Sequence, residues 1–403
     1  MCEQPEDDCA WIDDLMGKIA DKLDKNFDDI RYEVSTPTDS FCVSTLTFLN
    51  VIANSSSDNS EKQSVTNLVV KRMSPEADLR QVLKSSEQFH NEILFYEWYG
   101  KHYDNLPRCI YAKDAPPADS VIVLENMVSL RGYSLSQLKY DISLDYTLAA
   151  VREMARFHAN SYAMKEHRRE DFFAFVDNIQ EARFYPETNV KMIFDESATR
   201  SVEYLCKQGY DEGLCDKLQA RFENTYNNLI LKYVEPEEPL AILCHGDFTI
   251  NNTLFKKKNG ELTAMLIDFA LIRYGSPILD LSTFLSLHCA NDLDKDMLQN
   301  VLEVYHKTLI ENLEENGVDS DKFTYEALYE EYKRKGLFGF FIASFFLSVQ
   351  MDRTELRAKD ASTMDMDEWA RTMRTLGGDE VSEILANMLL RLKDAGCLDH
   401  VLH

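Results

Sequence analysis

The chain has 403 residues, 45% of them hydrophobic and 28% charged, a composition that excludes a wholly disordered protein and allows a large core. This length predicts two domains or lobes. The formal net charge of -26 argues against binding to nucleic acid or to anionic membranes, because it would repel both. A phosphate-bearing ligand would need local cations or a metal ion to bind to such a protein.

Nine cysteines are scattered along the chain, without the close spacing of a zinc site. They predict reduced thiols and a cytoplasmic location. The opening residues, MCEQPEDDCAWIDDL, are acidic where a secretory signal would be basic and then apolar. The apolar run at residues 336–349 is too short to cross a bilayer, so it predicts a buried core helix. Neither membrane association nor an obligate protein partner is expected.

The first third of the chain is predicted to be rich in strands. An N-terminal helical extension is expected within residues 1–30, from apolar residues at helical spacing: Ile12, Leu15, Met16, Ile19 and Leu23. Four strand regions then follow, the first of them readable as one long strand or two: 40–53, 65–73, 108–113 and 120–126. With a helix from about Leu79 to Tyr99, they form a predicted β-rich lobe over residues 31–126.

The remainder, residues 127–403, is predicted to be a larger and mainly helical lobe. Its first helix carries one apolar face: Leu148, Val151, Ala155, His158 and Tyr162. Short strands interrupt the helices between Ala241 and Ile267, with Asn259-Gly260 as a hairpin turn. The expected fold class is therefore α+β, with two lobes of unequal size.

Three oxygen-bearing side chains flank this hairpin in the sequence. Asp247 and Asn252 lie in the segment 243–255, LCHGDFTINNTLF, and Asp268 follows the apolar strand AMLI in the segment 265–281. Because a hairpin returns the chain on itself, we expect all three side chains to face one crevice. A carboxylate can accept a proton from a hydroxyl, and amide and carboxylate oxygens suit Mg²⁺ that bridges nucleotide phosphates. This is the minimum equipment for phosphoryl transfer.

A lysine and a glutamate upstream complete the pattern. Lys71 ends the strand NLVVK, where it is placed to hold phosphate oxygens if an acid fixes its flexible stem. Glu92 on the following helix is the preferred partner because an apolar stripe beside it points it inward; Glu87 and Glu97 are the alternatives. The order lysine, glutamate, aspartate–asparagine, aspartate is what a bilobal kinase requires.

Several motifs resemble a known family. The segments HGDFTINNTLF and LIDFALIRYGSPILDL are similar to the catalytic loop and metal-binding segment of the aminoglycoside phosphotransferase and choline kinase group. Within that group the patterns CHGD....NN.LF, IDF.L.RYGSP..DL and F..EI.FY look most like the ecdysteroid kinase-like (CHK kinase-like) family. The resemblance covers roughly Phe41 to Leu285. It implies a protein-kinase-like fold that uses ATP and Mg²⁺.

The resemblance also implies roles for individual residues. Asp247 would be the catalytic base, with Asn252 and Asp268 as magnesium ligands. Lys71 would bind phosphates and Glu92 would fix it.

Further positions follow from the same resemblance. The segment VLENM would be the hinge, so that Glu125 and Met127 offer backbone groups to adenine, and Asp280 would anchor the segment after the metal ligand. Two features depart from the family. Ala270 stands where glutamine is usual, and the expected phosphate loop, STPTDSFCVS, has no glycine, which leaves Ser40 and Ser44 as candidate contacts.

Structural explanations compete with these roles. Asp247 would cap a turn, Lys71 would be a solvated strand end and Glu92 a surface acid. Asp280 would cap the helix that begins LSTFLSL, an explanation that agrees with its family role. His245 and His158 are expected to be structural.

The preferred function is that of a phosphotransferase with an alcohol acceptor, and the family suggests that this acceptor is a small steroid-like (ecdysteroid) or other lipophilic alcohol. Three other functions stay open. They are a choline- or aminoglycoside-type kinase, a non-catalytic pseudokinase that binds a ligand, and a protein kinase. A protein kinase is disfavoured because Gly246 and Thr249 occupy the places of its arginine and lysine.

Overall fold

The structure is a computed structural model that describes residues 6–23, 30–36, 44–55, 62–188, 190–291, 293–353 and 365–402. The chain divides into two compact units, residues 1–134 and 135–403. The predicted boundaries at residues 30 and 126 stay predictions.

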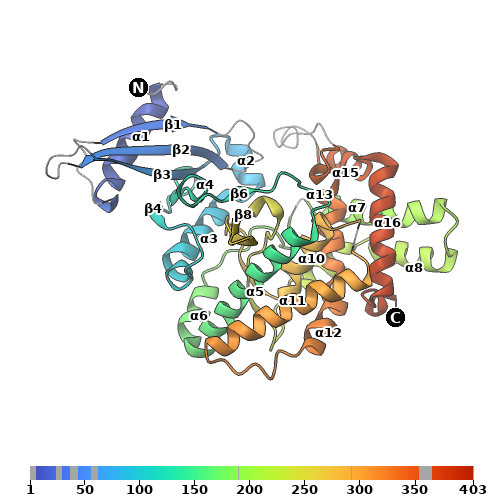
Figure 1. Ribbon diagram of the computed structural model, residues 1–403. Helices are drawn as coiled ribbons and strands as arrows, with labels where there is room; N and C mark the ends of the chain where they lie inside the picture. Colours follow the sequence, from blue (N-terminus) through green and yellow to red (C-terminus); the bar gives the residue numbers. More distant parts are fainter. Residues whose placement is uncertain are drawn as a thin grey trace. The chain divides into compact units, whose positions relative to one another are not determined.

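The first unit is built on a five-stranded antiparallel sheet in the order β1-β2-β3-β5-β4. Strands β1, β2 and β3 lie side by side in Figure 1. Its strands are β1 (Ile30–Ser35), β2 (Ser44–Ser55), β3 (Lys62–Met73), β4 (Cys109–Lys113) and β5 (Val121–Glu125). Its helices are α1 (Glu6–Ile19), η1 (Asp21–Leu23), α2 (Ala77–Val82), α3 (Ser85–Trp98), η3 (Tyr99–His102) and α4 (Met127–Arg131). The short strand β6 (Ser134–Leu135) spans the division between the units.

The predicted opening helix is confirmed, and its apolar face packs into the same core as the sheet. The core residues contributed by α1 are Ile12, Leu15, Met16 and Ile19. They meet side chains from alternate positions of the strands: Leu49, Val51, Leu68, Val70, Val121 and Val123. One face of the sheet is thus covered, because successive strand residues point to opposite sides.

The single helix predicted from Leu79 to Tyr99 is wrong in one respect. The structure has two helices, α2 and α3, because Lys84 adopts a left-handed backbone with φ of 50°. The side-chain amide of Gln88 donates to the carbonyl of Leu83 (2.5 Å), so this carbonyl has a hydrogen-bond donor at the break between the two helices. Strand β1 was not predicted at all.

The second unit is mainly helical, as predicted. Its helices before the hairpin are α5 (Leu144–His167), α6 (Arg169–Val176), α7 (Lys191–Lys207), α8 (Glu212–Phe222), η4 (Tyr226–Ile230) and α9 (Leu231–Tyr233). Those after it are α10 (Pro277–His288), α11 (Lys295–Glu315), α12 (Tyr325–Lys335), α13 (Leu337–Gln350), α15 (Met366–Thr375), α16 (Gly378–Asp394) and α17 (Asp399–Leu402). Helix α5 runs beside α11 (Figure 1), and α10 packs on α13.

The predicted hairpin of this unit is confirmed. Strands β8 (Thr253–Lys258) and β9 (Glu261–Leu266) pair in antiparallel register around Asn259 and Gly260, which have φ of 53° and 89°. Positive φ at both central residues is what an Asn-Gly turn of type I′ requires. Strand β7 (Ile242–Cys244) pairs with β10 (Arg273–Gly275), a strand that was not predicted.

The apolar run at 336–349 forms α13, which is buried over nearly its whole length, so the predicted core helix is confirmed. Within the described ranges, no helix is both long and apolar enough to cross a membrane.

Helices α10 and α13 approach closely at Gly339, and this contact predicts the effect of a substitution. A Cβ atom at Gly339 would lie 2.0 Å from the carbonyl oxygen of Ser282. Gly339→Ala is therefore expected to force the helices apart and to lower the free energy of unfolding by about 1–3 kcal/mol. The matched control is Gly213→Ala on α8, where the nearest atom is 3.6 Å away. Equal urea midpoints for the two variants would contradict this account.

Candidate active site

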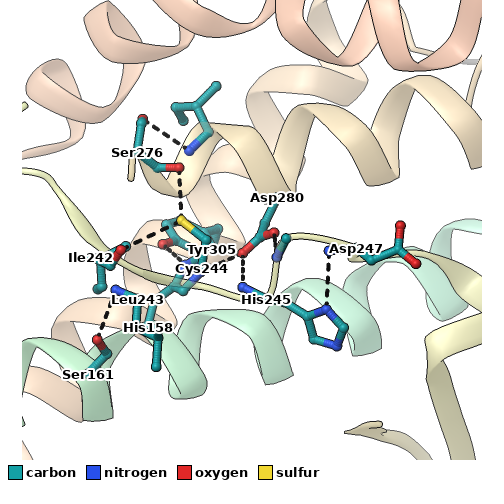
Figure 2. Close-up of polar contacts among 12 residues, drawn as sticks. His158, Ser161, Ile242, Leu243, Cys244, His245, Asp247, Ser276, Asp280 and Tyr305 are labelled. Carbon is teal, nitrogen blue, oxygen red and sulfur yellow. Dashed lines mark hydrogen bonds and ion pairs between the residues drawn. The ribbon is translucent and has the colours of Figure 1, made fainter. Parts of the chain in front are cut away.

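The loop between β7 and β8 is anchored by one buried carboxylate. Asp280, in the first turn of α10, accepts hydrogen bonds from the backbone N–H groups of His245 (2.7 Å) and Gly246 (2.9 Å) (Figure 2). The helix itself is capped by Ser276, whose hydroxyl accepts from the N–H of Ile278 (3.3 Å). The alternative that Asp280 is only a helix cap is therefore wrong.

A histidine and a tyrosine complete this anchor. His158 Nε2 contacts the Asp280 carboxylate at 3.1 Å and His158 Nδ1 contacts the Tyr305 hydroxyl at 2.7 Å. Burial, together with the nearby Cys244 and Asp280, raises the pKa of Tyr305 well above its ordinary value, so its hydroxyl stays protonated. A carboxylate oxygen accepts, so Nε2 is placed to donate to Asp280, and the Tyr305 hydroxyl can donate to Nδ1. His158 is a satisfied core histidine, as predicted.

The anchor also brings together three groups that metals can use. Ligand atoms of His158, Cys244 and Asp280 lie within 4.8 Å of one another. Both nitrogens of His158 already have partners, and the Cys244 thiol lies 3.2 Å from the carbonyl of Ser276. Burial raises the pKa of Cys244 well above its ordinary value, which disfavours the thiolate that metals bind. We interpret this cluster as structural.

The anchor carboxylate predicts a large effect on stability. Asp280→Ala would leave two buried N–H groups and one imidazole without their acceptor. We expect it to lower the free energy of unfolding by about 3–5 kcal/mol. The control is Asp394→Ala, because the Asp394 side chain is 74% exposed and its loss should change stability by about 0.5 kcal/mol or less. Urea denaturation of both variants tests this, and a small loss for Asp280→Ala would contradict the anchor role.

The backbone of the loop is shaped by His245 and Gly246. His245 Nε2 donates to the carbonyl of Ile267 (3.0 Å) and Nδ1 accepts from the N–H of Asp247 (3.3 Å). His245 is therefore structural, as predicted. Gly246 has φ of 79°, and a Cβ atom there would lie 1.7 Å from the carbonyl oxygen of Leu271. No residue but glycine fits this close approach.

Farther along the loop, a second histidine holds the backbone. His288 Nε2 accepts from the N–H of Ile250 (3.0 Å) and Nδ1 donates to the carbonyl of Lys139 (2.7 Å). Burial lowers the pKa of His288 to about 4, so it is neutral at pH 7 and can play both roles.

The loop that carries Asp247 is held in place by the contacts of Asp280, His245 and His288 with its backbone. The Asp247 side chain is 29% exposed and, in Figure 2, points away from the Asp280 anchor. Oδ2 accepts from the amide of Asn252 (2.8 Å), and Oδ1 accepts from the guanidinium of Arg183 (3.1 Å). These partners are side chains, not the N–H groups of a turn, so the turn-cap alternative does not describe Asp247.

Asn252 is held with a defined orientation. Its Nδ2 donates to both the carbonyl oxygen and Oδ2 of Asp247. Since both partners are acceptors, the amide nitrogen must face them, and Oδ1 is turned away. The carbonyl of Asn252 accepts from the N–H of Ile267 (3.0 Å), which brings the backbone next to Asp268 beside Asn252.

Asp268 itself has φ of 66°, a left-handed conformation that Asp and Asn tolerate better than most residues. The structure thus joins Asp247 and Asn252 directly and places Asp268 at the end of the adjoining strand. The Asn252 amide oxygen and the Asp268 carboxylate are hard oxygen donors, a set whose chemistry suits Mg²⁺.

The first unit joins the other predicted pair. The ammonium group of Lys71 on β3 lies 2.6 Å from the Glu92 carboxylate on α3. The side chains are 13% and 2% exposed, so Lys71 is not a solvated strand end and Glu92 is not a surface acid.

The remaining predicted positions are found at the edges of the same unit. Glu125 ends β5 and pairs with Arg108 (3.3 Å), and Met127 begins α4 and is buried. Ser44 is a buried residue at the start of β2. Ser40 and most of the predicted phosphate loop lie outside the described residues.

Arg183 was missed at the sequence level. It lies between α6 and α7, in the segment EARFY, which carries no motif. Only the folded chain shows that it contacts Asp247, far away in the sequence.

The model of the ecdysteroid kinase-like family matches residues 39–318. The chain belongs to the ecdysteroid kinase-like family. This membership confirms the predicted resemblance and fold class, and it identifies the protein as a small-molecule kinase, a phosphotransferase with a hydroxyl acceptor. No curated protein matches the chain significantly.

Several solved structures are similar to this family member over most of its length. A microcompartment-associated aminopropanol kinase has 12% identity and a TM-score of 0.46, covering 91% of this chain and 94% of its own. A GDP complex of a mutant aminoglycoside 2'-phosphotransferase-IIIa has 13% identity and a TM-score of 0.44, covering 89% and 97%. Plasmodium vivax ethanolamine kinase has 11% identity and a TM-score of 0.42, covering 91% and 82%.

Proposed function

We propose that this protein transfers the γ-phosphate of ATP to a hydroxyl group of a small lipophilic alcohol. The observation that carries the proposal is the Asp247–Asn252 pair, in which a half-buried carboxylate is held at 2.8 Å by an amide whose own oxygen is turned away. One side chain would then serve the acceptor and the other a metal ion. Phosphoryl transfer depends mainly on such positioning.

In this mechanism Asp247 accepts the proton of the acceptor hydroxyl. Each carboxylate oxygen has two lone pairs, so a hydroxyl can bind although Asn252 and Arg183 already donate to it. The Asn252 amide oxygen and the Asp268 carboxylate would hold Mg²⁺, which when bound neutralises the charge that develops on the phosphate oxygens. The anchors below the loop keep Asp247 in place during the reaction.

In the first unit, Lys71 would bind phosphate oxygens. Its partner Glu92 is nearly fully buried, so the pair fixes the otherwise flexible lysine stem. A lysine held in this way acts as a positive point charge of fixed position. Such a local positive charge is needed because the negative overall charge of the protein repels phosphate groups.

Adenine would bind the backbone at the end of β5. The N–H of Glu125 donates to the carbonyl of Arg108 (3.0 Å), and the carbonyl of Met127 accepts from the N–H of Tyr133 (3.3 Å). The groups proposed for the base are therefore the carbonyl of Glu125 and the N–H of Met127. This acceptor and donor match the amino group and ring nitrogen of adenine. Ser40 and Ser44 stay candidate phosphate contacts.

The acceptor class follows from the family and not from the geometry. Membership in the ecdysteroid kinase-like family supports a steroid-like alcohol, such as an ecdysteroid. The negative overall charge would instead favour a cationic acceptor of the choline or aminoglycoside type. The cytoplasm is the proposed location, and the cysteines that the structure describes as free thiols suit it: Cys109, Cys206, Cys215, Cys244, Cys289 and Cys397.

The test is a transfer assay with a panel of alcohols. Purified protein is incubated with ATP, Mg²⁺ and, in turn, an ecdysteroid, cholesterol, a long-chain alcohol, choline and an aminoglycoside, and the products are identified by mass spectrometry. We expect a phosphorylated alcohol that is absent with Asp247→Ala. Thermal stabilisation by ATP without transfer would support the pseudokinase alternative, for which buried Ala270 is the motivation. Phosphorylation of an added polypeptide would support a protein kinase.

A further inference from the structure

The segment between α6 and α7 is fixed next to Asp247 by Glu181. Its Oε1 accepts hydrogen bonds from the N–H groups of Arg183 (2.8 Å) and Phe184 (2.7 Å). Its other oxygen, Oε2, forms an ion pair with Arg273, a buried residue of β10. Arg273 is paired in register with Cys244 of β7, the strand that leads into the Asp247 loop. The turn that carries Arg183 is thus tied to the same strand pair as the loop.

From this turn, Arg183 reaches back to the loop. One guanidinium nitrogen lies 3.1 Å from Oδ1 of Asp247 and 3.4 Å from the carbonyl oxygen of Gly246. The guanidinium carbon lies 5.9 Å and 5.5 Å from the ring centres of Phe184 and Phe346, close enough for cation–π attraction. The side chain is 22% exposed. It is held on several sides, unlike a mobile surface arginine.

We propose that Arg183 is a positioning residue for Asp247, a role that rests on the proposed kinase function. The amide of Asn252 restrains Oδ2 only, which leaves the carboxylate free to rotate about its Cβ–Cγ bond. A second donor on Oδ1 fixes the plane of the carboxylate, and with it the direction of the lone pair that receives the hydroxyl proton. Arginine suits this task because it stays protonated at every physiological pH.

An ion pair on a catalytic base has an alternative meaning, which is autoinhibition. If Arg183 had to leave Asp247 before the acceptor could bind, removing it would raise the rate. The anchoring by Glu181 argues against such a departure, because the turn is fixed by two backbone hydrogen bonds and an ion pair. The two roles therefore predict changes in the rate of opposite sign.

The test measures kcat and KM for Arg183→Gln and Arg183→Lys, with ATP, Mg²⁺ and the best alcohol of the panel. We expect Arg183→Gln to lower kcat about 10- to 100-fold. The KM for ATP should stay unchanged, because Arg183 acts through Asp247. Arg183→Lys should recover part of the rate, and guanidinium ion well below denaturing concentrations should partly rescue Arg183→Ala. The matched control is Arg168→Gln, which removes an exposed arginine that pairs with Asp171 (3.0 Å), and its kcat should equal that of the wild type.

The outcomes separate this inference from the function on which it rests. A folded Arg183→Gln variant with unchanged or higher kcat overturns the positioning role while the kinase function stands. So does a loss confined to KM, or a loss that neither lysine nor guanidinium recovers. A folded wild-type protein without any ATP-dependent transfer overturns both.

Discussion

Replacing Asp247 with asparagine is expected to lower kcat by about 10²- to 10⁴-fold, the range that general base catalysis contributes. Asparagine has nearly the shape of aspartate, but its amide cannot take up the hydroxyl proton. The fold should survive, because the loop is anchored through the backbone N–H groups of His245 and Gly246 and not through this carboxylate. Product formation under saturating ATP and alcohol measures kcat, and circular dichroism checks the fold.

The matched control is Asp171→Asn. Asp171 also pairs with an arginine, Arg168 (3.0 Å), but on the exposed surface of α6. This variant should keep the wild-type rate. If Asp247→Asn were folded and as active as Asp171→Asn, the catalytic assignment would be lost and Asp247 would be a polar residue of the loop.

Local sequence signals were sufficient where the structure depends on short-range chemistry. The Asn259-Gly260 turn fixed the β8–β9 hairpin, because few other dipeptides adopt positive φ at both positions. Helix α13 followed from its continuous apolar run. The Lys71–Glu92 pair followed from the stripe beside Glu92, since a helix residue next to buried neighbours is itself turned inward.

Other features depend on contacts between distant segments. Strand β10 has three residues and exists only because it pairs with β7. The Arg183–Asp247 ion pair joins residues 64 positions apart, and Arg183 lies in a segment without regular structure. In each case tertiary contacts decide the conformation, and local propensity carries no signal.

The anchor of the loop shows both kinds of information together. The DL pair that contains Asp280 was recognised from the motif, but His158, which contacts this carboxylate, comes from α5, and Tyr305, which contacts His158, comes from α11. A buried carboxylate needs several donors to offset its desolvation, and these donors come from separate elements. The same contacts that stabilise the helical unit therefore also orient the candidate base.

Replacing Asp268 with asparagine is the second change with a large expected effect. The variant would keep an oxygen donor beside Asn252 but lose the negative charge that attracts Mg²⁺. We expect kcat to fall by about 10²- to 10³-fold, because metal stabilisation of the transition state is worth several kcal/mol. The Mg²⁺ concentration required for half-maximal rate should rise. Rates measured over a Mg²⁺ titration at fixed ATP test both expectations.

The choice of asparagine separates charge from backbone strain. Asp268 has φ of 66°, which asparagine tolerates, whereas alanine would add a conformational penalty of about 1–2 kcal/mol. Asp141→Asn is the matched control, because Asp141 is an exposed aspartate that also has a left-handed φ, of 53°. If both asparagine variants showed the wild-type Mg²⁺ dependence, Asp268 would not bind the metal. A loss confined to Asp268→Asn, with unchanged thermal stability, would place the charge of Asp268 at the magnesium site.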